Sequence, residues 1–187
     1  MNRENFITGV ATDSHRLSSS SIEIENVSNF MPLILPRKTV YQLCSILSEN
    51  TKELKMQTSE NKIKFTIGNM KLISKVIDGK FPDYKKVVPV TNDKKLIIKS
   101  KEFINSIERV ASVSLDRKEG VKLNIQKDNI QLSVNSANSG EGNEKIKAEF
   151  SSDNLNISFN SKYLIEIETE IEDSNIKMNL KDSVSPL

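Results

Sequence analysis

The chain has 187 residues, with 27 basic and 25 acidic side chains and a formal net charge of +2 at pH 7. This length suits one large domain or two small ones, and a core of that size needs no disulfide or metal for stability. The near-neutral balance excludes a protein that grips DNA through its overall field, so any nucleic-acid contact must come from local placement of charge.

The remaining bulk features concern the compartment. The single cysteine, Cys44, excludes an intrachain disulfide and suits a reducing environment. The first residues lack the basic and then apolar pattern of a signal peptide, and no apolar run approaches the roughly 18 residues of a membrane span. We therefore expect a cytoplasmic protein that makes no contact with a membrane.

The first half of the chain predicts a few strands, a helix and more strands. Residues 1–11 offer one or two strands at most. A helix is expected after Pro36, with one apolar stripe formed by Val40, Leu43, Cys44 and Leu47. After a turn at 60–61, alternation at a period of two predicts a strand over 62–67, with Ile63, Phe65 and Ile67 on one face.

The second half repeats this order more fully. Ser100 is expected to cap a helix whose apolar stripe is Phe103, Ile104, Ile107, Val110 and Ala111. Alternation predicts strands over 121–125, 130–134, 155–159 and 176–180, with turns at 127–129 and 139–143. A third helix should follow Asn160 or Ser161, with Tyr163, Leu164, Ile167 and Ile171 on its stripe.

The expected helix starts recur about every 60 residues, and strands follow each helix. This internal repeat of a strand–helix–strands module predicts an α+β fold in which helices cover one face of antiparallel sheets. The polar stretch at 89–95, with a proline and turn-forming residues, predicts a boundary between domains at 1–90 and 94–187. Because the first module looks incomplete and the last strand pair looks cut short, we expect a fragment of a larger protein.

Asp13-Ser14-His15 contains the three residue types of a hydrolase triad. If the segment is extended, Ser14 points away from Asp13 and His15, so no nucleophile would lie within reach of its base. No glycine-framed elbow surrounds the serine. A structural or binding role is therefore favoured over catalysis at this segment.

Other catalytic and cofactor sites lack their residues. With one histidine and one cysteine, only carboxylates remain as metal ligands, and they do not have the spacing of a calcium loop. The six glycines are scattered and form no phosphate-binding loop. We expect no metal and no cofactor, and an unrelated α+β enzyme would need a catalytic constellation that the sequence does not offer.

Basic residues stand at the ends of the expected helices. They are Arg37 and Lys38, Lys101, Arg117 and Lys118, and Lys162. Each alone is best explained as a solvated helix end, but their recurrence across three modules indicates a surface that meets phosphates. The segment 78–87, which contains an Asp-Gly turn and Phe81-Pro82, is either a packed loop or a docking surface.

Several stretches, in order, resemble the beta subunit of bacterial DNA polymerase III, the ring-shaped DNA sliding clamp. The similar stretches are 10–17 with Thr-Asp-Ser-His-Arg-Leu, 35–40 with Pro-Arg-Lys, 78–87 with Phe-Pro-Asp-Tyr, 117–123 and 180–186. The resemblance implies the DNA-clamp fold, with residues 1–90 as most of the middle domain and 94–187 as most of the C-terminal domain. It also implies a processivity factor that tethers the polymerase and other partners to double-stranded DNA without catalysis of its own.

The resemblance further implies two sets of functional residues. In the family, partner proteins insert a short apolar peptide between these two domains, and the matching positions are Thr12, His15, Arg16, Leu17, Pro82, Lys86 and Val87. The basic helix ends at Arg37, Lys38, Lys101, Arg117 and Lys118 match the DNA-facing side of the ring. There, contacts that ignore sequence would let the protein slide.

Some features depart from the family pattern. Ser14 replaces a usual glycine, and Lys86 stands where arginine is common, so a planar fork becomes a point charge. Full-length members form ring homodimers, but the first domain has no counterpart here, so ring closure is not expected of this chain. The alternative to a working clamp is a partial clamp that acts at most as a protein-interaction module.

Overall fold

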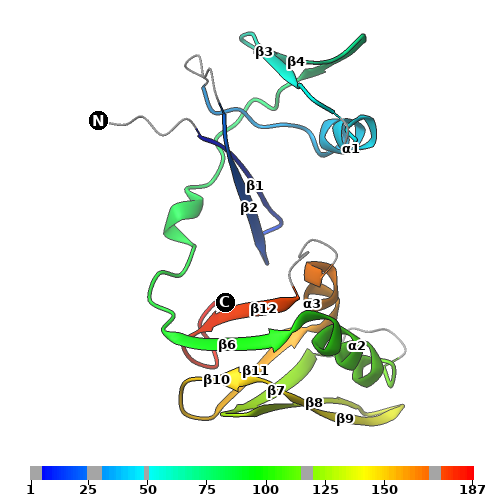
Figure 1. Ribbon diagram of the computed structural model, residues 1–187, viewed down its shortest axis with the longest axis vertical. Coiled ribbons are helices and arrows are strands. Elements are labelled where there is room, and N and C mark those ends of the chain that lie inside the picture. The colour runs from blue at the N-terminus through cyan, green and yellow to red at the C-terminus, as the bar shows by residue number, and fades with distance from the viewer. Residues whose placement is uncertain (1–5, 25–30, 49–50, 115–119, 169–173) are drawn as a thin grey trace. The chain divides into compact units, whose positions relative to one another are not determined.

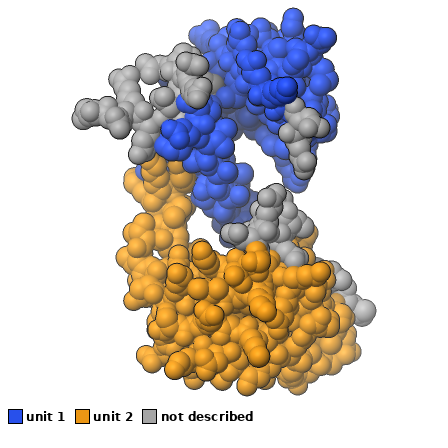
Figure 2. All heavy atoms as spheres, viewed as in Figure 1, with its two compact units in different colours: residues 1–83 blue, residues 84–187 orange. Residues whose placement is uncertain are grey.

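The computed structural model describes residues 6–24, 31–48, 51–114, 120–168 and 174–187. The chain separates into two compact units, residues 1–83 and residues 84–187 (Figure 2). The boundary between the two units therefore falls before the polar stretch 89–95, where the sequence predicted it. That stretch is hydrogen-bonded to residues of the second unit. Asn92 Nδ2 donates to the carbonyl oxygens of Asn179, at 2.9 Å, and Pro186, at 2.8 Å.

The first unit contains a hairpin, a helix and a three-stranded sheet (Figure 1). Strands β1 (Phe6–Thr12) and β2 (Leu17–Glu23) form the antiparallel hairpin. Helix α1 (Arg37–Ile46) starts directly after Pro36, as predicted. Strands β3 (Lys55–Thr58), β4 (Lys62–Ile67) and β5 (Met70–Lys75) pair antiparallel in the order β3-β4-β5.

Burial in the first unit is slight. Ile63 and Phe65 on β4 are buried, and the Thr39 hydroxyl of α1 lies 2.6 Å from the Ser74 hydroxyl of β5. The residues of the predicted apolar stripe of α1 are half-buried or exposed. Within the described helix, the buried residue is Thr39. The alternation over 62–67 therefore predicted the buried strand correctly, whereas the helical stripe overstated the burial of α1.

The second unit begins with the 3-10 helix η1 (Tyr84–Lys86), and its described residues form two sheets and two further helices. One sheet has the order β10-β6-β12, and the other β11-β7-β8-β9, with every pair antiparallel. The strands are β6 (Lys94–Lys99), β7 (Gly120–Gln126), β8 (Asn129–Ser136), β9 (Gly140–Lys147), β10 (Glu149–Phe150), β11 (Leu155–Asn160) and β12 (Asn175–Leu180). The helices are α2 (Ser100–Ala111) and α3 (Ser161–Glu168), which lie side by side (Figure 1).

A large apolar core fills the second unit. It joins the inner faces of the strands to α2 and α3, with Phe103, Ile107, Leu123, Leu132 and Leu164 among its members. The apolar residues that alternation marked on the predicted strands of this unit are buried, apart from the partly buried Phe159, and the whole predicted stripe of α2 is buried as well. The core also contains residues that the sequence patterns did not mark: Leu96, Ile98, Ile146, Ala148 and Phe150. Of the predicted α3 stripe, Leu164 is buried, Tyr163 and Ile167 are half-buried, and Ile171 lies outside the described residues.

Two local predictions need correction. Ser100 does not cap α2: it is the first helical residue, Lys99 precedes it, and no side chain bonds to the free amides at that end. The stretch 139–143 is not all turn, because β9 already begins at Gly140, which pairs with Ser136 at the end of β8. Pairing with a neighbouring strand here outweighs the turn preference of the two glycines.

A polar cluster joins α2 to β9. The Glu144 carboxylate accepts hydrogen bonds from Arg109 Nε at 3.0 Å and from Ser106 Oγ at 2.9 Å. The bond from Arg109 lowers the pKa of Glu144, and the Ser106 bond lowers it further against the opposing effect of burial. Since the folded pKa is lowered, the stabilisation is present above the ordinary glutamate pKa and is lost as pH falls through the lowered value.

We expect Glu144→Gln to reduce the free energy of unfolding by about 1 kcal/mol at pH 7, because the ion pair with Arg109 is lost and a neutral amide oxygen is a weaker acceptor than a carboxylate. At acid pH, below the ordinary glutamate pKa and through the lowered value of Glu144, the wild type loses the same charge, so the difference between the two proteins should shrink. Urea denaturation of both proteins at pH 7 and at acid pH measures this difference in the free energy of unfolding. Glu108→Gln, an exposed change on α2, is the control, and a difference that does not shrink in acid would contradict the assignment.

Candidate functional site

The turn between β1 and β2 holds four of the residues predicted to bind a partner. Thr12 and Leu17 are paired across the end of the hairpin, and Asp13 to Arg16 form the connection between them. The Thr12 hydroxyl donates to the carbonyl oxygen of Arg16 at 2.8 Å, which closes the turn. Thr12, His15 and Arg16 are exposed, and Leu17 is half-buried, so the hairpin end presents polar groups beside an apolar one.

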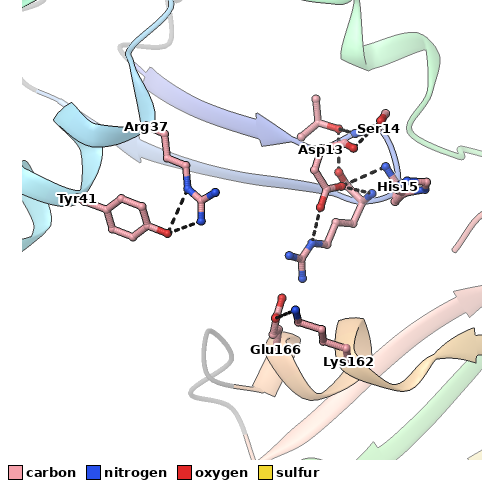
Figure 3. Close-up of polar contacts among 9 residues, drawn as sticks. Asp13, Ser14, His15, Arg37, Tyr41, Lys162 and Glu166 are labelled. Atoms are coloured by element: carbon pink, nitrogen blue, oxygen red, sulfur yellow. Dashed lines mark hydrogen bonds and ion pairs between the residues drawn. The ribbon is translucent and has the colours of Figure 1, made fainter. Parts of the chain in front are cut away.

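The Asp13 carboxylate organises this turn (Figure 3). One oxygen accepts hydrogen bonds from the backbone amides of Arg16, at 3.0 Å, and His15, at 3.1 Å. The other oxygen accepts from Arg16 Nε, also at 3.0 Å. The two backbone bonds are the main reason why the pKa of Asp13 lies below its ordinary value. One carboxylate therefore fixes both the backbone and the side chain of the residues predicted to contact a partner.

The structure changes the interpretation of Asp13-Ser14-His15. The segment is a turn and not an extended strand, because Ser14 has a φ of 71° in the left-handed region. Asp13 bonds to backbone amides and to Arg16, and the Ser14 hydroxyl donates to the carbonyl oxygen of Asp13. These contacts give the three residues a structural explanation. A left-handed residue also explains why a glycine suits this position in the family pattern.

The other three predicted partner-binding residues follow β5. Pro82 is exposed and ends the first unit together with Asp83. Lys86 is exposed in η1 and Val87 follows it, with 62% of Val87 accessible to solvent. The amides of Val87 and Val88 donate to the carbonyl oxygen of Tyr84, which curls this segment. The predicted set is therefore divided, with five residues in the first unit and two in the second.

The predicted DNA-facing residues lie at helix starts. Arg37 and Lys38 open α1, and Lys101 is the second residue of α2; all three are exposed. Arg37 donates from Nη2 to the Tyr41 hydroxyl at 2.7 Å, and its guanidinium carbon lies 5.2 Å from the ring centroid (Figure 3). The hydrogen bond with the Tyr41 hydroxyl raises the pKa of Arg37 above its ordinary value. Arg117 and Lys118 lie outside the described residues.

Tyr41 and Asp13 take part in these contacts, but neither of them was predicted from the sequence as a partner-binding or DNA-facing residue. Tyr41 anchors Arg37 one helical turn away, a spacing of four residues that places both on one face. Asp13 was considered as a triad member, but its preference for bonding amides two and three residues ahead could have identified the turn. Lys162, at the start of α3, is 4.0 Å from Glu166 and forms an ion pair with it.

Metal-ligand clusters and membrane-spanning helices are both absent from the described ranges. No group of three or more histidine, cysteine or acidic side chains within those ranges is placed to hold a metal ion. None of the helices in the described part of the chain has the length and apolar character needed to cross a membrane.

Family models match the chain from end to end. The central domain of the DNA polymerase III beta subunit matches residues 1–83, and the C-terminal domain of the same protein matches residues 85–187. The beta sliding clamp of Caulobacter vibrioides is 31% identical over 184 residues, which cover 98% of this chain and 50% of the relative. The beta sliding clamp of Escherichia coli K12 is 31% identical over 94% of this chain and 48% of its own length.

Solved structures agree with this match. The sliding clamp of Bartonella birtlesii bound to griselimycin is 37% identical, with a TM-score of 0.91 over 96% of this chain and 49% of its own. The Pseudomonas aeruginosa clamp is 30% identical, with a TM-score of 0.92 over 97% and 50%. The chain spans about half the length of the relatives it matches. With its two halves matched in order by consecutive domains of one protein, the chain belongs to the DNA polymerase III beta subunit family.

Proposed function

We propose that this chain acts as a sliding-clamp processivity factor in the cytoplasm, where it tethers replicative DNA polymerase III and other partners to double-stranded DNA and catalyses no reaction. The observation that carries the proposal is the ordered match to the central and C-terminal domains of the beta subunit over residues 1–83 and 85–187. The hairpin turn organised by Asp13 and the exposed basic helix starts supply the chemistry that such a protein needs.

Partner proteins are proposed to bind through a short apolar peptide. Leu17, Pro82 and Val87 would contact its apolar side chains. Because Val87 is 62% exposed, its side chain has substantial apolar surface to bury on binding. Thr12, His15, Arg16 and Lys86 would surround it with polar groups, an arrangement common to specific ligand sites. The Asp13 contacts hold Arg16 and His15 in place before the peptide arrives, which reduces the entropy lost on binding.

The experiment titrates the purified chain with a fluorescent peptide that carries the short apolar motif of a clamp-binding protein. Saturable binding is expected, and a scrambled peptide of the same composition should not bind. A folded chain that binds neither peptide, or both equally, would contradict the proposal and leave only a partial clamp without partner recognition. Far-ultraviolet circular dichroism establishes that the chain is folded.

DNA is proposed to contact Arg37, Lys38, Lys101, Arg117 and Lys118 through its phosphates. Arg37 and Lys38 are neighbouring charges on one helix start, and Tyr41 restrains the Arg37 guanidinium. Lysine and arginine at these positions would neutralise phosphates without reading bases, because phosphate contacts carry no direct sequence information. Binding should therefore be independent of sequence and sensitive to salt.

Arg37→Gln/Lys38→Gln should weaken binding to duplex DNA about tenfold at low salt. If two phosphate contacts are lost, the slope of log K against log salt should fall in magnitude by about 1.8. Fluorescence anisotropy across a salt series measures both values. Lys145→Gln/Lys147→Gln, on exposed positions of β9, removes the same charge elsewhere and should change the slope little. Equal slopes for the two double variants would contradict the assignment of Arg37 and Lys38.

A further inference from the structure

One face of the sheet β3-β4-β5 is covered with lysine side chains. Residues directly opposite each other on paired strands share a face, and alternate residues along a strand return to it. The register pairs Lys62 with Lys75, Lys64 with Ile73 and Gln57, and Thr66 with Lys71 and Lys55. This face, called the lysine face here, therefore consists of Lys55, Gln57, Lys62, Lys64, Thr66, Lys71, Ile73 and Lys75.

The lysine face points away from the core of the first unit. The opposite face carries the buried residues Ile63 and Phe65 and also Ser74, whose hydroxyl bonds to Thr39 of α1. Because successive side chains of a strand point to opposite sides, α1 lies on the far side of the sheet from the lysines. Four of the five lysines are exposed and Lys64 is half-buried, so their ammonium groups are accessible to another protein that binds this face.

The charges on this face are not neutralised within the described part of the chain. No carboxylate occupies a position of the lysine face, and none of the five lysines makes an ion pair with another described residue. Lys62 and Lys75 stand directly opposite each other on β4 and β5. Like charges in that position destabilise a sheet, so an anionic partner would offset a repulsion built into the strand pair.

The neutral residues of the face indicate which anion fits. Ile73 lies between Lys71 and Lys75 on β5 and is 63% exposed, so an apolar side chain stands within the basic surface. A phosphate backbone offers no apolar partner to this isoleucine. The face also has no aromatic side chain on which a base could stack and no arginine fork for a phosphate. An acidic protein segment with an apolar residue among its carboxylates matches both the charge and Ile73.

We propose that the lysine face binds an acidic segment of a partner protein that places an apolar side chain against Ile73. This surface is formed by β3, β4 and β5, whereas the residues proposed for clamp partners and DNA lie on other elements, so it adds a separate interaction to the proposed function. Along β4 the lysine face extends from Lys62 to Thr66, a length of roughly 13 Å, which is enough for about four residues of an extended peptide.

The probe is a fluorescent acidic peptide with one central leucine, together with a matched peptide in which serine replaces that leucine. The full chain should bind the leucine peptide more tightly, and higher salt should weaken both. Lys62→Gln/Lys64→Gln/Lys75→Gln should reduce affinity tenfold or more, and Ile73→Ser should remove the preference for leucine. The matched control, Lys127→Gln/Lys145→Gln/Lys147→Gln, removes three exposed lysines of the second unit and should leave binding within twofold.

A thermal measurement separates lost binding from lost folding. Lys75→Gln relieves the repulsion opposite Lys62, so the free variant should melt at the same or a higher temperature while it binds the acidic peptide less well. Absence of binding to either peptide by the folded wild type would overturn the proposal. So would tighter binding of a short DNA duplex that is insensitive to Ile73→Ser, because that result would assign the face to nucleic acid.

Discussion

Replacing Gly142 with alanine is expected to destabilise the second unit by about 2 kcal/mol, within the range that overpacking costs. A Cβ atom at this position of β9 would lie 2.7 Å from the carbonyl oxygen of Val110 and 3.1 Å from its Cα atom. Both are backbone atoms of α2, so they cannot move aside by a change of rotamer. The helix or the strand must shift, and the core between them includes Val110 itself.

For a domain of about 100 residues, this loss corresponds to a fall of roughly 10 °C in the thermal midpoint. Gly120→Ala is the matched control in the same unit, because its new Cβ would make an ordinary contact of 3.5 Å with the carbonyl oxygen of Phe159. That change should be neutral or slightly stabilising, since alanine restricts the unfolded chain. Equal thermal midpoints for the two variants would contradict the close approach of β9 to α2.

Asp13→Ala is expected to weaken binding of the clamp partner peptide about tenfold, although Asp13 itself is not proposed to touch the peptide. The substitution removes the acceptor for the amides of His15 and Arg16 and for Arg16 Nε. The turn then samples other conformations, and ordering it again on binding costs free energy. Asp13→Asn should have an intermediate effect, because its amide oxygen still accepts from the backbone but carries no charge for Arg16.

The graded order of aspartate, asparagine and alanine is the outcome that distinguishes positioning from a general loss of charge. Asp153→Ala, an exposed change in the second unit, is the control and should not affect affinity. If the asparagine and alanine variants bind the peptide as the wild type does, Asp13 does not position the turn. If asparagine is as damaging as alanine, the ion pair with Arg16 matters more than the backbone contacts.

Much of the second unit could be predicted from the sequence because its core enforces periodicity. The alternating residues of β7, β8, β11 and β12 must face a buried layer, so a pattern of two appears in the chain. The α2 stripe is equally clear because that helix packs against the strands β6 to β9 and against α3. In these elements the spacing of apolar residues indicates the type of element and its buried face, whereas β6 was not predicted although Leu96 and Ile98 are buried.

Elements with little burial escaped the same reasoning. Strand β2 is largely exposed and contains four consecutive serines, so no alternation marks it. Strand β9 begins with Gly-Glu-Gly-Asn, a sequence typical of turns, and is held in the sheet by its pairing with β8. In both strands, backbone hydrogen bonds to a neighbour supply what the side chains do not, and a sequence pattern does not record those bonds.

The candidate site was predictable in part. The resemblance over residues 10–17 marked the hairpin end, but a triad was argued against only for an extended Asp13-Ser14-His15, whereas Ser14 adopts a left-handed backbone in a turn. The lysine face also went unnoticed. Its residues come from three strands, and only the cross-strand register shows that they share one surface. Long-range pairing of this kind is the information that local spacing lacks.

The most direct test of the clamp assignment compares the wild-type chain with His15→Ala/Arg16→Ala in titrations of the same fluorescent clamp partner peptide. We predict saturable binding by the wild type and affinity at least tenfold lower for the double variant, because two polar contacts and the charge of Arg16 are lost. Lys85→Ala, next to Lys86 in η1, serves as the control and should bind normally. Equal affinity of the wild type and the folded double variant would contradict the assignment of the hairpin turn to partner binding.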